Sequence, residues 1–246
     1  MSSEDGAFLA DYDTTKFPRP SVTVDVALLT VENGALRTLL LRRTEPPYRR
    51  RWALPGGFVR LDESIDAAAA RVLADKTGIR GVFLEQLFTF GAPHRDPRTR
   101  VITVAYFALV DAARLVRELG PDERRDLLLA TLDVPWEGET GGPVDAVDDG
   151  RALSLAFDHA DILGTAVKRV RGKLDYTPIG FQLLPERFTL AELQRVHETI
   201  LGRPLNKDSF RRRMLASGLL EATGEQREGV DHRPPELYRF ARRSAV

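Results

Sequence analysis

The stretch from Gly57 to Ile79 reads GFVRLDESIDAAAARVLADKTGI, and it decides the fold of this chain. Ser64 is of a residue type that caps helix N-termini, and the alanine-rich run after it favours a helix that reaches about Thr77. Gly78 then suits the left-handed conformation in which many helices end. The stretch therefore predicts a loop that starts on a glycine and leads into one helix.

The spacing within this stretch resembles the Nudix box, G-x5-E-x7-R-E-U-x-E-E-x-G-U, where U is a bulky apolar residue. Six positions match the pattern in type and spacing: Gly57, Glu63, Arg71, Leu73, Gly78 and Ile79. The preceding run WALPGGFV, from Trp52 to Val59, is similar to the segment that leads into such a box. The competing interpretation is a surface helix whose match to the pattern is accidental.

Three positions depart from the box. Where the family carries its metal-binding and catalytic glutamates, this chain has Val72, Asp75 and Lys76. Residues three and four apart on a helix share a face, so we expect these side chains to point the same way. Mg²⁺ prefers several hard oxygen ligands, and here a single carboxylate would stand beside an ammonium group. We therefore expect no metal site and no catalytic residue at the degenerate box positions, which are Glu63, Val72, Asp75 and Lys76.

Composition excludes several classes of protein. The 246 residues suffice for one large or two modest domains, and 43% hydrophobic residues are enough for buried cores. The chain has no cysteine, which excludes a disulfide framework and a thiolate metal site. The first ten residues are polar and acidic, and no long uncharged apolar run follows them. We therefore expect a cytoplasmic protein with no membrane partner.

The segment before the box predicts a β-hairpin. Residues 21–31, SVTVDVALLTV, are apolar and β-branched, the turn signal Asn33-Gly34 follows, and residues 36–42 form the returning strand. Two more strands are predicted after the box, at 82–90 and 101–110. The basic loop between those two strands would border the ligand pocket of a Nudix protein; the alternative is a solvated loop.

Residues 111–150 are acid-rich and predict irregular structure. The run FDHADIL that follows is similar to the start of the last helix of many Nudix domains, with Asp158 as its cap and an end near Leu174. No nucleophile pattern accompanies His159, so we expect it to be a structural or capping residue.

The C-terminal part predicts a helix-turn-helix followed by a hairpin. Thr189 caps a helix with apolar residues at helical spacing, and Asn206 caps a second helix that ends at Gly218. Short strands at 219–221 and 236–240 flank a polar loop. This order of elements is that of a winged helix-turn-helix.

The second of these helices is rich in arginine. Phe210, Met214 and Leu215 are expected to face the core, and the arginines to face outward. The second helix of such a motif enters the major groove, where arginine pairs with guanine. The expected DNA-binding residues are Lys207, Ser209, Arg211, Arg212, Arg213, Arg227 and Arg233. The alternative is a small helical dimerisation domain whose arginines are merely solvated.

Charge is consistent with a polyanionic partner but does not establish one. Residues 176–246 hold 12 Lys+Arg and 9 Asp+Glu, against 24 and 27 in the rest of the chain. This imbalance is small, although its sign suits a basic C-terminal module.

A degenerate Nudix domain followed by a winged helix resembles the Nudix-related transcriptional regulators of the NrtR family. The resemblance spans residues 21–240 and is most specific in the run FTLAELQRVHETILGRPLNKDSFRRR, residues 188–213. It implies an α+β fold, with a Nudix α/β/α sandwich and mixed sheet over residues 1–175 and a winged helix-turn-helix over 176–246. It further implies a homodimer on a palindromic operator in double-stranded DNA, a repressor of NAD or sugar metabolism genes that is associated with the bacterial nucleoid when bound.

The resemblance also implies an effector, ADP-ribose or a related nucleotide, and no required cofactor. The ligand-binding residues that we expect are Arg43, Trp52, Gly56, Gly57, Phe58, His94 and Arg95. The alternative function is an active Mg²⁺-dependent Nudix hydrolase, such as an ADP-ribose pyrophosphatase, in which acidic residues outside the box would help to bind Mg²⁺.

Overall fold

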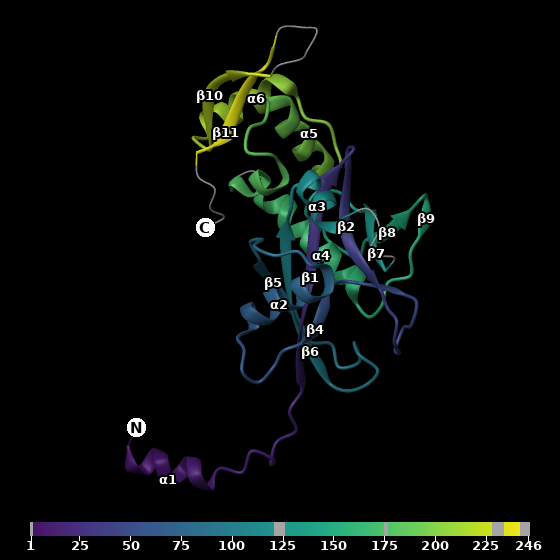
Figure 1. Ribbon diagram of the computed structural model, residues 1–246, viewed down its shortest axis with the longest axis vertical. Helices are drawn as coiled ribbons and strands as arrows, with labels where there is room; N and C mark the ends of the chain where they lie inside the picture. The colour runs from purple at the N-terminus through teal and green to yellow at the C-terminus, as the bar shows by residue number, and fades with distance from the viewer. Residues whose placement is uncertain (1, 121–125, 175–176, 228–233, 242–246) are drawn as a thin grey trace.

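The computed structural model describes residues 2–120, 126–174, 177–227 and 234–241. A nine-stranded mixed sheet dominates it, in the order β5-β6-β1-β2-β7-β8-β9, with β3 paired to β2 and β4 to β1 (Figure 1). The strands of this sheet are β1 (Ser21–Glu32), β2 (Ala35–Arg42), β3 (Trp52–Ala53), β4 (Gly56–Phe58), β5 (Glu85–Phe90), β6 (Val101–Leu109), β7 (Leu127–Asp133), β8 (Asp145–Asp148) and β9 (Arg151–Ala152). A smaller sheet pairs β10 (Leu220–Gln226) with β11 (Glu236–Phe240). The helices are α1 (Ser3–Asp11), α2 (Ile65–Thr77), α3 (Ala112–Leu119), α4 (His159–Lys173), the 3₁₀ helix η1 (Pro178–Leu183), α5 (Leu190–Leu201) and α6 (Lys207–Ala216).

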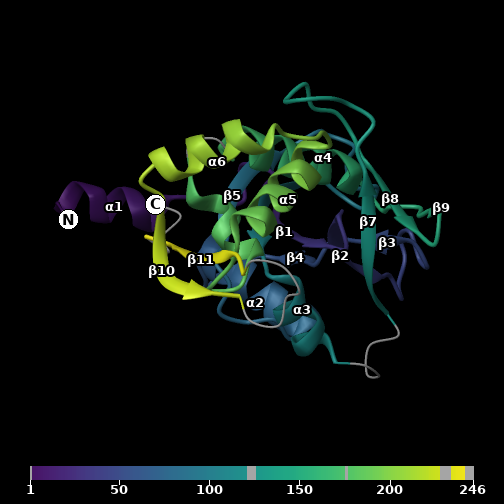
Figure 2. The same cartoon turned by 90° about the horizontal axis from the view of Figure 1, so that it is seen from above.

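The central strand β1 has two buried faces. Successive side chains of a strand point to opposite sides, so Val26 and Leu28 face one core and Ala27 and Leu29 face the other. Helices α2 and α3 cover the first face and α4 covers the second, as Figure 2 shows from above. β1 runs parallel to β6 and antiparallel to β2 and β4. The expected α/β/α sandwich with a mixed sheet is confirmed.

The ends of α2 follow the local sequence. Ser64 accepts the backbone N–H of Ala67 at 3.1 Å, and the helix stops at Gly78, which has a φ of 77°. Glycine adopts this left-handed conformation without a steric cost. The hairpin of β1 and β2 turns at Asn33-Gly34 as predicted, with Glu32 paired to Ala35.

Two predictions for the middle of the chain were wrong. The segment 111–150 is not irregular, because it contains α3, β7 and β8. β7 is held by pairing with β2 on the sheet, with Leu39 opposite Leu129, a contact that its own acid-rich surroundings do not suggest. The strand predicted at 82–90 begins only at Glu85.

The C-terminal part has the predicted winged helix order, α5, α6, β10 and β11. Thr189 and Glu192 form a reciprocal capping box at the start of α5, and Asn206 caps α6 through the N–H of Ser209 at 3.0 Å. Phe210 and Met214 are buried as expected. Leu215 is 44% exposed, so its assignment to the core was wrong.

The end of α6 and the first strand of the hairpin also differ from the prediction. α6 ends at Ala216, two residues before Gly218, and β10 extends to Gln226. Phe188 pairs with Tyr238 through two backbone hydrogen bonds of 2.8 and 3.0 Å, which adds a third segment to the small sheet.

One apolar core joins the two parts of the chain. It runs from Ala27 and Ile162, beneath the large sheet, to Phe188, Ile200 and Phe210 in the winged helix. The division at residue 175 therefore stays a prediction based on sequence. In the described ranges, no helix has both the length and the apolar content that a membrane crossing requires.

Candidate functional site

One arginine holds the acidic residues that remain beside α2. Arg71 donates to the Glu63 carboxylate from Nε at 2.8 Å and from Nη2 at 2.6 Å. The backbone N–H of Arg60 donates to the same carboxylate at 2.8 Å. The Arg71 hydrogen bonds, followed by that of Arg60, lower the pKa of Glu63 to about 2. Asp75 lies 3.7 Å from Arg71 Nη1, so both carboxylates already have a cationic partner.

Val72 lies in a different environment from Asp75 and Lys76. Its side chain is 2% exposed and belongs to the core between α2 and the sheet, whereas Asp75 and Lys76 are exposed. A Cβ atom on Gly57 would lie 3.0 Å from Val72 Cγ2, so a glycine permits this close approach. The expectation that all three side chains share one ligand-facing surface is therefore wrong for Val72.

The box positions do not fit a magnesium ion. Mg²⁺ needs near-octahedral oxygen ligands, and the carboxylates of Glu63 and Asp75 are engaged by Arg71. Within the part of the chain that the structure describes, no group of three or more His, Cys, Asp and Glu side chains could hold a metal ion. No metal-dependent hydrolytic step can be derived from this arrangement.

Two arginines and two aromatic rings gather beside β4, and we call them the arginine–aromatic cluster: Arg43, Phe58, Arg98 and Phe157. The Arg98 guanidinium lies 5.5 Å from the centre of the Phe58 ring and 5.9 Å from that of Phe157. The Arg43 guanidinium lies 4.9 Å from the Phe157 ring centre. Burial, followed by the positive charge of Arg98, lowers the pKa of Arg43. Asp96 already accepts hydrogen bonds from Arg98 Nε at 3.1 Å and Nη2 at 2.7 Å, so an anionic ligand would meet the remaining donors of the two arginines, and the rings offer faces for stacking.

The other expected ligand residues lie in β3, in β4 and in the loop before β6. Trp52 is half-buried in β3, and Gly56 and Gly57 lie in β4. A Cβ on Gly56 would meet Asp25 Oδ1 at 2.1 Å, so the glycine accommodates a buried aspartate. His94 is exposed in the loop before β6.

Arg95 belongs to a buried network. Its guanidinium donates two hydrogen bonds to Asp158, at 2.6 and 2.8 Å, and lies 3.5 Å from Asp25. Asp25 also accepts the hydroxyl of Thr103 at 2.7 Å. The Arg95 side chain is 4% exposed and paired with aspartates, and its expected role in ligand binding stays a prediction. Asp158 occupies the expected N-cap position of α4, but its side chain makes no capping hydrogen bond, since Arg95 engages that carboxylate.

His159 has the structural role that the sequence suggested. Its Nδ1 accepts the backbone N–H of Leu54 at 2.9 Å, and its Nε2 lies 3.6 Å from Asp25 Oδ1. Burial is the largest influence on its pKa, which is lowered. The ring therefore acts as a neutral acceptor that ties the start of α4 to the segment before β4.

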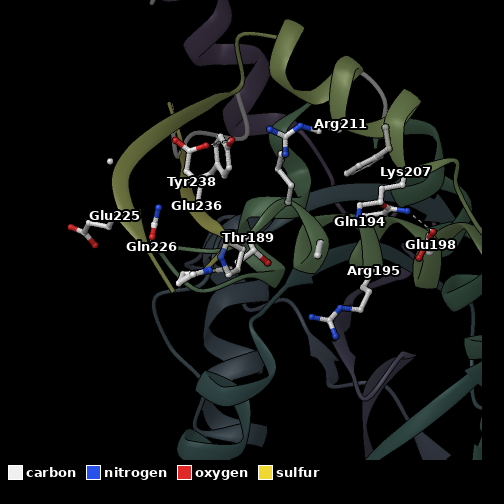
Figure 3. A pocket seen from close by; sticks show the side chains of 16 residues that line it. Thr189, Gln194, Arg195, Glu198, Lys207, Arg211, Glu225, Gln226, Glu236 and Tyr238 are labelled. Atoms are coloured by element: carbon white, nitrogen blue, oxygen red, sulfur yellow. Dashed lines mark hydrogen bonds between the residues drawn. The ribbon is translucent and has the colours of Figure 1, made fainter. Parts of the chain in front are cut away.

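A groove of about 1150 Å³ lies in the winged helix, between α5, α6 and the two strands β10 and β11 (Figure 3). Its lining includes three cations, Arg195, Lys207 and Arg211. The three glutamates of the lining already accept hydrogen bonds or ion pairs: Glu198 from Leu205, Glu225 from Arg187, and Glu236 from Tyr238. Among the residues that the structure describes, only Glu225 of these three has a cationic partner, so the lining balances three cations against three carboxylates. The three cations are the groups that can contact a phosphate-rich partner.

The turn between α5 and α6 is held by two side chains of α5. Glu198 accepts the backbone N–H of Leu205 at 2.9 Å, and Gln194 donates to the Leu205 carbonyl at 3.1 Å. Gln194 also donates to Glu198 at 2.9 Å. The Leu205 amide, followed by Gln194, lowers the pKa of Glu198. These bonds fix the angle at which α6 leaves α5.

The other expected DNA-binding residues are dispersed. Ser209, Arg212 and Arg213 are exposed on α6 but do not line the groove. Arg227 makes two hydrogen bonds to Glu192, at 2.6 and 2.7 Å, so it is an internal partner of α5. Arg233 lies outside the described residues.

Comparisons with known proteins agree with both halves of this geometry. Residues 19–138 match the NUDIX domain model, and residues 180–240 match the NrtR DNA-binding winged helix domain. The ADPR responsive transcriptional repressor NtrR of Acinetobacter baylyi is 40% identical over 241 residues, which are 97% of this chain and 89% of the relative. The chain belongs to the NrtR family.

Two solved structures place the NrtR-family fold beside ligands. Shewanella oneidensis NrtR complexed with a 27mer DNA is 34% identical, with a TM-score of 0.71 over 89% of this chain and 93% of that one. The NUDIX domain of the same protein complexed with ADP ribose is 30% identical, with a TM-score of 0.52 over 69% of this chain and 99% of that one.

The sequence did not single out two arginines of this NrtR-family protein that lie at the candidate sites. These are Arg195 in the groove and Arg98 in the arginine–aromatic cluster. Arg195 was overlooked, although the buried Leu193 and Val196 on either side of it indicate that it points outward from α5. Arg98 was noted only as part of a basic loop. Its approach to Phe157, which is 59 residues away in the chain, has no local signal.

Proposed function

We propose that this chain is a ligand-responsive transcriptional repressor that binds double-stranded DNA through α6 and the adjoining groove. The observation that supports this most is the groove itself, where Arg195, Lys207 and Arg211 line a concave surface beside a helix of the recognition type. The 40% identity to an ADP-ribose-responsive repressor supports the same assignment.

In this proposal the Nudix part binds ADP-ribose or a related nucleotide without consuming it. The arginine–aromatic cluster supplies two cations for a diphosphate and two rings for stacking. Val72 and Lys76 stand where a hydrolase has metal-binding glutamates, and Asp75 at the third such position is paired with Arg71. The effector therefore acts as a signal, and no cofactor is needed.

We further propose that two copies bind a palindromic operator and control genes of NAD or sugar metabolism. One recognition helix covers little DNA, so two helices about 34–36 Å apart would occupy successive major grooves. While bound, the protein is part of the bacterial nucleoid.

DNA binding is tested by fluorescence anisotropy with the DNA upstream of the protein's own gene, against a scrambled duplex of equal length. Specific binding is expected to be at least about a thousandfold tighter than binding to the scrambled duplex at the same salt concentration. Equal affinity for both duplexes would reject the repressor function.

Effector binding is tested by titrating ADP-ribose calorimetrically, with and without saturating operator. Coupling free energies of about 1–3 kcal/mol are typical, and linkage requires the operator to weaken ADP-ribose binding by the same factor as ADP-ribose weakens operator binding. Arg98→Gln is expected to lose ADP-ribose binding, and Arg117→Gln, which alters an exposed arginine on α3, to retain it.

The alternative function is a Mg²⁺-dependent ADP-ribose pyrophosphatase. It predicts release of AMP from ADP-ribose, which Arg71's hold on Glu63 and Asp75 opposes. We expect no AMP above the background of a mock purification, and turnover that survives further purification would favour the hydrolase.

A further inference from the structure

The N-terminal arm, residues 2–20, carries apolar surface that the rest of the described chain does not cover. Its helix α1 stands clear of the sheet and of the winged helix, joined to β1 by an extended segment (Figure 1). Phe8 and Phe17 are each 65% exposed, and Leu9 and Tyr12 are exposed beside them. A helix of nine residues is too short to be stable alone in water. This surface therefore calls for a partner.

The charge of the arm indicates which kind of partner surface it can bind. Residues 2–13 contain four acids, Glu4, Asp5, Asp11 and Asp13, and no lysine or arginine. Such a segment is repelled by nucleic acid. Asp11 ends α1 at the pole where the helix dipole favours a cation, and the last turn contains no basic residue. A partner surface that is apolar and also carries a cation fits both the exposed apolar side chains and the acidic charge of the arm.

A groove with these properties lies at the edge of the large sheet. This β5–α4 groove has a volume of about 500 Å³ and is lined by Phe88 and Phe90 of the edge strand β5 and by Lys168 and Arg169 of α4. Glu139 is the one acidic side chain among the described residues of this lining, against two cations. The Phe88 side chain is 57% exposed. Arg169 donates to the carbonyl of Leu87, whereas the exposed Lys168 makes a long hydrogen bond of 3.4 Å to Thr140, which leaves its ammonium accessible to an acid.

The link between α1 and β1 favours a groove on another molecule. Pro18 and Pro20 fix their own φ angles and keep the residues before them extended. The arm therefore continues away from its own sheet, and nine extended residues can span about 30 Å. A second copy of the chain is already required by the proposed operator complex.

We propose that the N-terminal arm of one copy docks in the β5–α4 groove of a second copy. Phe8 and Leu9 lie against Phe88 and Phe90, and the carboxylate of Asp11 faces Lys168. A twofold axis makes the exchange reciprocal, so each copy both gives and receives an arm. This assignment rests on the homodimer of the proposed function.

The absence of cysteine from the chain allows a direct test by crosslinking. Ala7→Cys on the arm and Thr165→Cys in the groove are made in separate chains carrying tags of different size, then mixed and mildly oxidised. A disulfide-linked heterodimer is expected. Thr199→Cys in place of Thr165→Cys is the matched control, because both threonines lie within helices and bond the carbonyl four residues earlier at 2.8 Å. No heterodimer is expected with that control.

A second test measures dimerisation by sedimentation without any crosslink. Phe8→Asp is expected to raise the dimer dissociation constant at least about tenfold, because it removes the burial of one large apolar side chain. Val116→Asp, which alters an exposed apolar side chain on α3, is expected to leave the dissociation constant unchanged.

The outcomes of these experiments distinguish the arm exchange from the formation of the homodimer itself. A wild-type chain that stays monomeric would overturn both the homodimer and the arm exchange. A dimer that neither crosslinks through Ala7→Cys and Thr165→Cys nor responds to Phe8→Asp would overturn the exchange alone. A disulfide that forms within one doubly substituted chain diluted in excess wild type would assign the groove to the chain's own arm and overturn the proposal.

Discussion

Arg71 and Val72 are neighbours in the sequence and have opposite roles beside the box. Arg71 neutralises the carboxylates of Glu63 and Asp75 from the surface, while Val72 fills space against Gly57 in the core. An acidic centre therefore cannot be restored by charge alone. A carboxylate at position 72 would enter a packed apolar layer.

Val72→Glu is expected to lower the free energy of unfolding by about 3 kcal/mol, because it buries an unpaired carboxylate. Lys76→Glu, on the exposed side of α2, is expected to change it by less than about 0.5 kcal/mol. Urea unfolding with and without about 10 mM Mg²⁺, a saturating concentration for a weak site, measures both. Recovery of stability by Mg²⁺ in Val72→Glu would mean that the position does reach a metal.

His159 gives stability a defined dependence on pH. Its pKa is lowered in the folded chain by burial, so the unfolded chain takes up a proton below the ordinary value of about 6.5 while the folded chain does not. Its contribution is therefore fully present above about pH 6.5 and is lost as the pH falls below it. His159→Gln is expected to flatten the fall in unfolding free energy between pH 7 and pH 5. His94→Gln, an exposed control, is expected to keep the wild-type slope.

At the scale of elements, the arginines of the winged helix are of two kinds. Some form ion pairs inside the domain, and others line the groove. Arg227 is bound to Glu192, so Arg227→Ala is expected to weaken DNA binding without changing its dependence on salt. Arg211 lines the groove, so Arg211→Ala is expected to lower the slope of log K against log salt by about one. Affinities at four salt concentrations measure both slopes. If Arg227→Ala also lowers the slope of log K against log salt, Arg227 contacts a phosphate group.

Elements with local signals were predicted well, and elements that depend on distant partners were not. As expected, α2 begins after Ser64 and ends at Gly78, and α6 begins after Asn206. These positions have local signals because a capping residue needs only backbone groups a few residues away. β7 was missed because its partner, β2, lies about ninety residues earlier in the chain. The pairing of Arg95 with Asp158 was missed for the same reason, since Asp158 is 63 residues away.

At the scale of the whole molecule, Arg171 connects three segments. Its buried guanidinium donates to the carbonyls of Ile200 at 2.7 Å, Trp136 at 3.0 Å and Gly138 at 3.1 Å. It therefore joins the end of α4 to the end of α5 and to the segment after β7. Desolvation lowers its pKa, and the three carbonyls compensate for the lost water.

Arg171→Lys is expected to destabilise the chain by about 2 kcal/mol, because an ammonium cannot reproduce the geometry of three guanidinium hydrogen bonds. Calorimetry is expected to show one unfolding transition in the wild type and two in the variant, as the winged helix separates from the sheet. The exposed Arg203→Lys serves as the control. A single transition in Arg171→Lys would mean that the shared apolar core is sufficient to couple the two parts.

Helix α4 is anchored at both ends by buried side chains, His159 at its start and Arg171 near its finish. Its fifteen residues make a rod about 22 Å long. Because the helix is long, a small tilt moves its far end appreciably. A tilt of about 10° at the sheet would displace the far end by about 4 Å. That displacement is comparable to the rise of one base pair, about 3.4 Å. A rotation small enough to leave the sheet intact would thus shift the α5 end of the winged helix by about the rise of one base pair.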